Sequence, residues 1–175
     1  MARSKHYFFI TGLPRTRTAW LANFLTYGDK SLCYHEAFAD GDIETVFGMT
    51  KCDYIGNSDC GNTYFLSSIR TLYPNAVHVL IKRPAGEVKV SLGKLLNEDV
   101  NDTVDKLSAH IEDYERITRP LVVDFKDLDS ENIIRKIWGA CLPEIPFDKP
   151  RWEMLRMMNV QITKERLADL KRRWG

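Results

Sequence analysis

The segment over residues 7–20 constrains the fold of this chain more than any other part of the sequence. Residues 7–11 (YFFIT) form a β-favouring run without polar alternation, which is typical of a strand buried on both faces of a parallel sheet. Gly12 and Pro14 interrupt this run. The pattern then predicts a helix over about 18–27, because apolar residues recur at helical spacing: Trp20, Leu21, Phe24 and Leu25.

The loop between these two elements has the chemistry of an anion site. A strand that runs through Gly12 into a helix start aims several backbone N–H groups, and the positive end of the helix dipole, at one point. Four consecutive residues add positive charge and hydroxyl donors: Arg15, Thr16, Arg17 and Thr18. An ordinary turn with surface arginines is the alternative, but the composition favours a phosphate-binding loop.

The loop differs from that of ATPases and GTPases, whose pattern is GxxxxGK[ST]. The corresponding string here is GLPRTRTA, in which Arg17 takes the place of the second glycine and Thr18 that of the lysine. The lysine that reaches the β- and γ-phosphates and the hydroxyl that binds magnesium are therefore both missing from this loop. A divergent nucleotide kinase is an alternative that the loop favours less.

The rest of the chain alternates strands with helices. Further strands are expected at 31–34, 54–56, 77–82 and 121–125. Further helices are expected at 64–73, from Pro84 to Leu96, at 103–117, around 133–138 and at 164–173, and 36–63 otherwise reads as loop with one small helix. This order predicts a single α/β domain over residues 1–175, with a mostly parallel sheet between two helical layers and ligands beyond the carboxyl ends of the strands.

The composition is that of an ordinary globular protein. The formal net charge is +1, 44% of residues are apolar, and no apolar run approaches the length of a membrane span. We therefore expect neither a nucleic-acid partner nor a membrane partner. The four cysteines lack the CxxC pairs of a zinc site and the density of a disulfide scaffold, so reduced thiols in a cytoplasmic protein are expected. The four histidines lack metal-ligand spacing, so no metal is expected.

At the first loop the sequence resembles the sulfotransferase family, whose donor loop reads PRSGTTW or PKSGTTW between a strand and a helix. Four residues match outright: Pro14, Arg15, Thr18 and Trp20. Thr16 replaces a serine with another hydroxyl, whereas Arg17 replaces the loop glycine and adds a side chain where the backbone normally approaches the phosphate. The resemblance implies that the donor is bound by Pro14, Arg15, Thr16, Arg17, Thr18, Ala19 and Trp20.

Two further segments carry the same resemblance. The string VLIKRPAGEVKVSL looks like the family's VRDPREVAVSL, in which an arginine at a strand end and a serine eight residues later hold the 3′-phosphate of the donor; Arg83 and Ser91 match them. The string PLVVDFKDLDSENI looks like VVRYEDLVADP, with Phe125 at the tyrosine, where it could approach the adenine or pack in the core. The late RKG motif of the cytosolic enzymes is absent from the sequence.

The resemblance implies a P-loop NTPase-like sulfotransferase fold and transfer of a sulfuryl group from 3′-phosphoadenosine 5′-phosphosulfate (PAPS) to a hydroxyl or amine of a small-molecule or glycan acceptor. Arg15 matches the cation that contacts the leaving phosphate. The second strand ends in CYHEAF, which places Glu36 and His35 at the sheet edge as candidate bases, with Glu36 favoured. Trp20 matches an adenine-stacking tryptophan, although a packing role is equally open.

Two other readings of the candidate site stay open at this point. His35 and Glu36 could simply cap their strand or pair with Arg15 or Arg17. A non-catalytic module that keeps the fold and the nucleotide but has lost transfer would also fit the small size of the chain. The sequence carries no signal of the acceptor's identity or of the oligomeric state.

Overall fold

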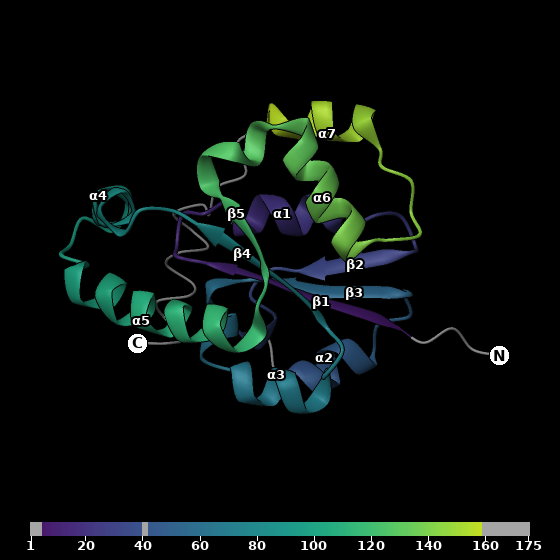
Figure 1. Cartoon of the computed structure of the whole chain (residues 1–175), viewed down its shortest axis with the longest axis horizontal. Coiled ribbons are helices and arrows are strands. Elements are labelled where there is room, and N and C mark those ends of the chain that lie inside the picture. The colour runs from purple at the N-terminus through teal and green to yellow at the C-terminus, as the bar shows by residue number, and fades with distance from the viewer. Residues whose placement is uncertain (1–4, 40–41, 159–175) are drawn as a thin grey trace.

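Five parallel strands form one sheet in the computed structural model, which describes residues 5–39 and 42–158. The strands are β1 (His6–Gly12), β2 (Ser31–Tyr34), β3 (Tyr54–Ser58), β4 (Val77–Lys82) and β5 (Leu121–Asp124). They are arranged in the order β2-β3-β1-β4-β5, so the strand that leads into the candidate loop lies at the centre (Figure 1). The expected α/β fold with a parallel sheet is confirmed.

Helices cover both faces of this sheet (Figure 1). The α-helices are α1 (Thr18–Leu25), α2 (Ile43–Gly48), α3 (Leu66–Leu72), α4 (Ala85–Leu96), α5 (Asn101–Thr118), α6 (Glu131–Cys141) and α7 (Lys149–Arg156). Short 3₁₀ turns are η1 (Ala37–Ala39), η2 (Cys60–Thr63) and η3 (Phe125–Asp129). Helices α1, α6 and α7 pack on one face, and α2, α3 and α5 on the other. Within the described ranges, none of the helices is both long and apolar enough to cross a membrane.

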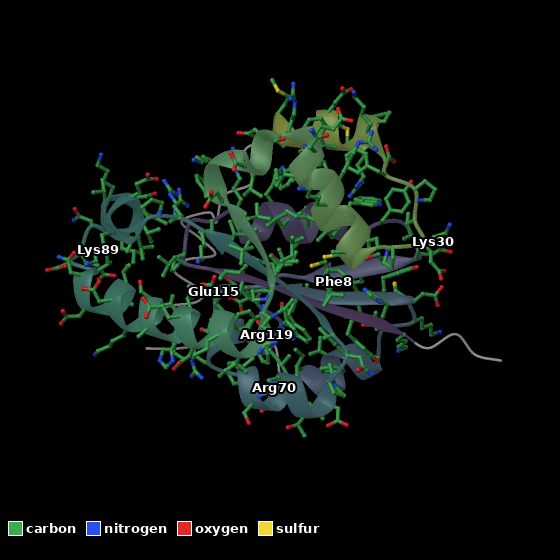
Figure 2. The ribbon with its side chains drawn as sticks, in the orientation of Figure 1. Phe8, Lys30, Arg70, Lys89, Glu115 and Arg119 are labelled. Atoms are coloured by element: carbon green, nitrogen blue, oxygen red, sulfur yellow. The ribbon has the colours of Figure 1, made fainter. Side chains whose placement is uncertain are left out.

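The central strand is apolar on both sides because each side faces a separate part of the core. Phe8 and Ile10 pack with residues of α1 and α6, whereas Phe9 packs with residues of α2 and α3. Phe8 is fully buried, and charged side chains such as Lys30 and Arg70 lie at the periphery (Figure 2). Burial on both faces explains why residues 7–11 show no polar alternation.

Strand β3 is longer than the sequence predicts and lies inside the sheet. It extends to Ser58, two residues beyond the predicted end, and it is inserted between β2 and β1. A Cβ on Gly56 would overlap the ring of Phe8, so this position requires glycine for close packing. As a result, β2 is not adjacent to β1, and its end is separated by one strand from the first loop.

Helix α7 lies in a region where the sequence analysis predicts no helix. The Asp148 side chain accepts a hydrogen bond from the backbone N–H of Arg151, and a proline occupies the first turn. Trp152 and Leu155 are buried in the same core cluster as α1. The helix predicted over 164–173 lies outside the described residues.

Candidate functional site

Left-handed backbone conformations are concentrated at the carboxyl edge of the sheet. Among the described residues, five non-glycine residues have positive φ. Asn97 and Arg119 are helix C-caps, where this conformation is common. The other three are Arg15 (φ 69°), Arg17 (φ 62°) and Glu36 (φ 63°), all candidate site residues. Conformations of this kind cost energy and cluster at functional sites, so their location supports a ligand site at this edge.

The loop after β1 is held by close packing around Gly12 and Thr16. A Cβ on Gly12 would lie 2.6 Å from the carbonyl oxygen of Ile81 and 2.7 Å from Thr16 Oγ1. Thr16 is fully buried, and its hydroxyl donates to the carbonyl oxygen of Leu13 at 2.7 Å. In this structure the hydroxyl is therefore used within the loop, where it stabilises the loop from inside. Pro14 is half-buried within the same loop.

The backbone N–H groups at the start of helix α1 lack hydrogen-bond partners within the helix. Its first backbone hydrogen bond runs from the N–H of Leu21 to the carbonyl oxygen of Arg17, so the N–H groups of the first three helical residues have no partner within the helix: Thr18, Ala19 and Trp20. The first turn contains no acidic side chain. Both the free N–H groups and the helix dipole therefore favour an anion at this point.

Arg15, Arg83 and Ser91 meet beside this helix start. The Arg15 Nε atom donates to Ser91 Oγ at 3.3 Å, and Arg83 Nη1 donates to the carbonyl oxygen of Arg15 at 2.7 Å. The Arg83 side chain is only 17% exposed and also pairs with Glu87 at 3.2 Å. The loop, the end of β4 and the middle of α4 are thus joined through two guanidinium groups.

The guanidinium groups of two arginines lie near the ring of Phe125. The guanidinium carbon of Arg83 lies 4.3 Å from the ring centroid, and that of Arg17 lies 5.7 Å away. Arg17 also pairs with Asp129 at 2.8 Å. Phe125 begins the turn η3 rather than ending β5, so the predicted strand 121–125 is one residue too long. The half-buried ring lies at the sheet edge, next to the arginines.

Trp20 lies inside the core rather than at the loop surface. It is 4% exposed, stacks on Phe24 at 5.1 Å between ring centroids, and donates its indole N–H to the carbonyl oxygen of Leu155. Of the two roles that the sequence left open, the structure therefore supports packing, because no face of the indole is free to stack on a base.

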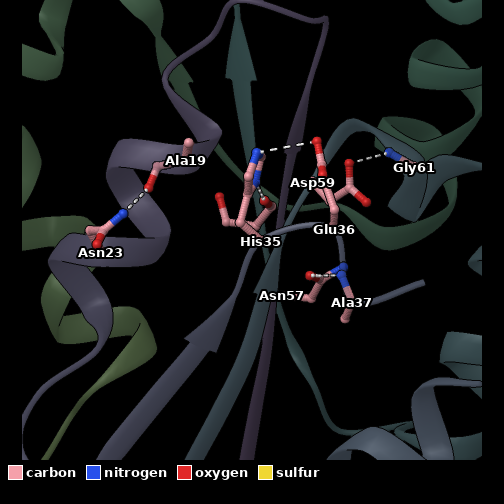
Figure 3. Close-up of polar contacts among 9 residues, drawn as sticks. Ala19, Asn23, His35, Glu36, Ala37, Asn57, Asp59 and Gly61 are labelled. Atoms are coloured by element: carbon pink, nitrogen blue, oxygen red, sulfur yellow. Dashed lines mark hydrogen bonds and ion pairs between the residues drawn. The ribbon is translucent and has the colours of Figure 1, made fainter. Parts of the chain in front are cut away.

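His35 and Glu36 lie together at the end of β2 (Figure 3). The His35 Nδ1 atom lies 2.7 Å from the carbonyl oxygen of Ser58 on β3, and Nε2 lies 3.5 Å from Glu36 Oε1. Arg15 contacts Ser91, and Arg17 pairs with Asp129.

The contact with Ser58 fixes the tautomer of His35. A carbonyl oxygen only accepts hydrogen bonds, so Nδ1 must carry a proton and donate it. In a neutral imidazole the lone pair is then on Nε2, which is buried and has no hydrogen-bond partner among the described residues. Histidine bases in enzymes are oriented in this way, with one nitrogen held by an acceptor and the other available for a proton.

The end of β3 holds a buried polar network that sequence reasoning missed. The Asn57 amide donates to Asn62 Oδ1 at 2.7 Å, and its own oxygen accepts from the N–H of Ala37 at 3.2 Å. Asn62 in turn donates to the carbonyl oxygen of Ile10 at 2.9 Å. The signal was the polar string GNSDCGN, which begins inside β3 and continues beyond its end. This network fixes the backbone that carries Glu36 relative to β1 and β3.

The cysteines are structural thiols. Within the described residues, none of the four forms a disulfide. Burial raises the pKa of the Cys33, Cys60 and Cys141 thiols, and the Asp59 carboxylate raises that of Cys60 further. These thiols stay protonated and unreactive.

Comparison with known proteins adds no assignment to this geometry. No protein-family model matches the chain, and no characterised protein matches its sequence significantly. In the part of the chain that the structure describes, no group of three or more histidine, cysteine, aspartate or glutamate side chains is arranged to hold a metal ion.

Proposed function

We propose that this chain is a sulfotransferase that moves a sulfuryl group from PAPS to a hydroxyl or amine acceptor. One observation carries the proposal: Arg83 contacts both the carbonyl oxygen of Arg15 and the ring of Phe125. These residues come from the three segments that resemble the sulfotransferase family. Segments far apart in the sequence therefore converge at one edge of the sheet.

The proposed donor position follows from the charges at this edge. The 5′-phosphosulfate would occupy the N-terminus of α1, where free N–H groups and Arg15 provide donors. The 3′-phosphate would lie between Arg83 and Ser91, which are already oriented toward the loop. The ring of Phe125 offers an apolar surface to the adenine, in place of the buried Trp20.

In the proposed chemistry, Arg15 stabilises the charge that develops on the bridging oxygen as the sulfuryl group leaves. This role needs a fixed cation near the leaving group, and the contact of Arg15 with Ser91 restricts the guanidinium group. Removal of one such donor from an active site typically lowers kcat by about 10²–10³-fold.

His35 is the better candidate for the acceptor's base. In the neutral imidazole the lone pair is on Nε2, and the carboxylate of Glu36 at 3.5 Å is placed to stabilise the imidazolium that forms. The hydroxyl or amine of the acceptor would bind next to Nε2, on the side where Glu36 lies. This assignment reverses the preference for Glu36 that the sequence suggests, while keeping both residues in the site.

A transfer assay tests the proposal. Purified protein is incubated with sulfur-labelled PAPS and a panel of alcohols, phenols, amines and saccharides, and labelled product is counted. We expect transfer by the wild-type protein and a loss of at least about 100-fold in Arg15→Ala. Arg116→Ala removes a solvent-exposed arginine from α5 and serves as the matched control.

The two alternatives give different results in the same experiments. Nucleotide binding without transfer to any acceptor, unchanged by substitution at His35 or Glu36, would identify a binding module. Magnesium-dependent turnover of ATP would identify a kinase.

A further inference from the structure

A cavity of about 400 Å³ lies between α5 and the ends of β4 and β5. It is lined by segment 81–85, by Leu13 of the candidate loop, by Asp124 at the end of β5, and by four residues of α5: Ser108, Ile111, Glu112 and Glu115. This volume is within the range of small-molecule sites. The proposed donor chemistry does not use the cavity.

The cavity and the arginine cluster lie on opposite faces of the sheet. Side chains alternate along β4, so Leu80 packs with residues of α5 and Ile81 packs with residues of α6. Lys82 continues the α5 side and pairs with Glu115, whereas Arg83 turns to the other side, toward Phe125. Arg83 also lines the cavity, but its guanidinium group contacts the carbonyl oxygen of Arg15 and the ring of Phe125.

The charges that face the cavity are predominantly negative. Two cations also line the cavity, and both are already paired: Lys82 Nζ lies 2.8 Å from Glu115 Oε1, and Arg83 Nε lies 3.2 Å from Glu87 Oε2. Glu112 and Asp124 also line the cavity, and neither carboxylate forms a hydrogen bond or ion pair within the described part of the chain. An anion would be repelled here, whereas a cation would compensate two carboxylates.

Apolar residues form the floor between these carboxylates. Leu13 and Ile111 are almost fully buried, and Pro84 and Ala85 complete the surface. A small inorganic cation would gain nothing from this floor, because it would have to lose its hydration shell against hydrocarbon. A ligand with an ammonium group and an apolar body would bury its body on the floor and place its charge at the rim.

We propose that this cavity is a second binding site, separate from the donor site, and that it takes an organic amine with one ammonium group and an apolar body. The ammonium group contacts the carboxylates of Glu112 and Asp124. The apolar body lies between Ile111 and segment 82–85. This site does not depend on sulfuryl transfer, so its test uses binding alone.

The test compares benzylamine with benzyl alcohol, which share a ring and differ in charge. Binding to the full chain is followed by two-dimensional NMR titration without nucleotide. We expect saturable shifts of residues on α5 and in segment 82–85, with benzylamine at least tenfold tighter than benzyl alcohol at low salt and the difference decreasing as salt is added.

Variants locate the site. The double substitution Glu112→Gln with Asp124→Asn should reduce the affinity for benzylamine to that for benzyl alcohol. Asp113→Asn is the control, because this exposed neighbour on α5 pairs with Arg116 and does not line the cavity. Ser108→Leu fills the cavity and should abolish binding of both probes, while circular dichroism checks that each variant is folded.

Three results would overturn the proposal. They are equal affinity for the two probes, no saturable binding of benzylamine up to millimolar concentration, and binding that persists in the folded Ser108→Leu variant. Equal affinity would mean that the cavity binds the apolar ring but does not select for a positive charge. None of these results bears on PAPS binding, so the two proposals fail separately.

Discussion

Arg17 combines an unfavourable backbone conformation with a favourable charge. It occupies the loop position that is glycine in the sulfotransferase motif, and its φ of 62° explains why glycine suits that position. The ion pair of its side chain with Asp129 and the contact with Phe125 offset part of the cost of this conformation. An exposed pair of this kind contributes about 0–1 kcal/mol, which is less than the cost of about 1–3 kcal/mol for the conformation.

Substitution of Arg17 separates these two effects. We expect Arg17→Gly to be more stable than Arg17→Ala by about 1 kcal/mol, because both lose the ion pair but only glycine relieves the left-handed conformation. The free energy of unfolding in urea measures the difference. A more stable alanine variant, as in a helix interior, would show that the loop does not hold this conformation in solution.

His35 and Glu36 are distinguished by their hydrogen bonds. Asn at position 35 can still donate to the carbonyl oxygen of Ser58, but it has no basic nitrogen to take the proton from the hydroxyl or amine of the acceptor. We expect His35→Asn to lower kcat for sulfuryl transfer by about 10²–10⁴-fold with the affinity for the desulfonated nucleotide PAP unchanged within about twofold. Glu36→Gln should have a smaller effect. The reverse order of the two effects would return the role of base to Glu36.

At the scale of elements, sequence patterns predict the strands in which apolar residues predominate. The predicted strands 31–34 and 77–82 match β2 and β4. The full extent of β3 could not be predicted, because its polar end is stabilised by Asn62, which contacts it only after the turn η2 forms. Helix α7 could have been found from Asp148 and the proline that follows it.

Trp20 tests whether the first helix contributes a base-stacking residue or only core packing. Trp20→Phe removes the indole N–H that donates to Leu155 and leaves a small cavity, so we expect a loss of about 1–3 kcal/mol in the free energy of unfolding. Affinity for PAP should stay within about twofold. Phe125→Ala is the counterpart, and we expect it to weaken PAP binding with little loss of stability. A larger loss of PAP affinity in Trp20→Phe than in Phe125→Ala would contradict this account.

At the scale of the whole molecule, the sequence predicts which segments contribute to the candidate site but not how they meet. The resemblance identifies Arg83 and Ser91, yet the hydrogen bond from Arg15 to Ser91 depends on the register of β1 against β4. Likewise, the proton on His35 Nδ1 depends on β3 being inserted beside β2. Such contacts join residues distant in sequence, and no local pattern encodes them.

Global stability should depend on pH through His78. Burial lowers the pKa of His78 from 6.5 to about 4 in the folded protein. The unfolded chain therefore binds a proton that the folded chain does not, so stability is complete above pH 6.5 and is lost as the pH falls toward 4, by up to about 3 kcal/mol.

Urea unfolding of wild-type protein and His78→Gln between pH 4 and 7 isolates this contribution. The variant should have a flatter dependence on pH than the wild type, since glutamine keeps hydrogen-bonding capacity next to Tyr114 but does not titrate. His110→Gln, at an exposed position of α5, is the control and should follow the wild type. Parallel curves for all three proteins would rule out a contribution from His78.

The central claim is that this sheet edge recognises a 3′-phosphorylated adenine nucleotide, and calorimetric titration with PAP and with ADP tests it most directly. PAP should bind at least tenfold more tightly than ADP, because charge-assisted hydrogen bonds from Arg83 and Ser91 each contribute about 1.5–3 kcal/mol only when a 3′-phosphate is present. Ser91→Ala should reduce this preference without weakening ADP binding. Equal affinities of the wild-type protein for PAP and ADP would contradict the account.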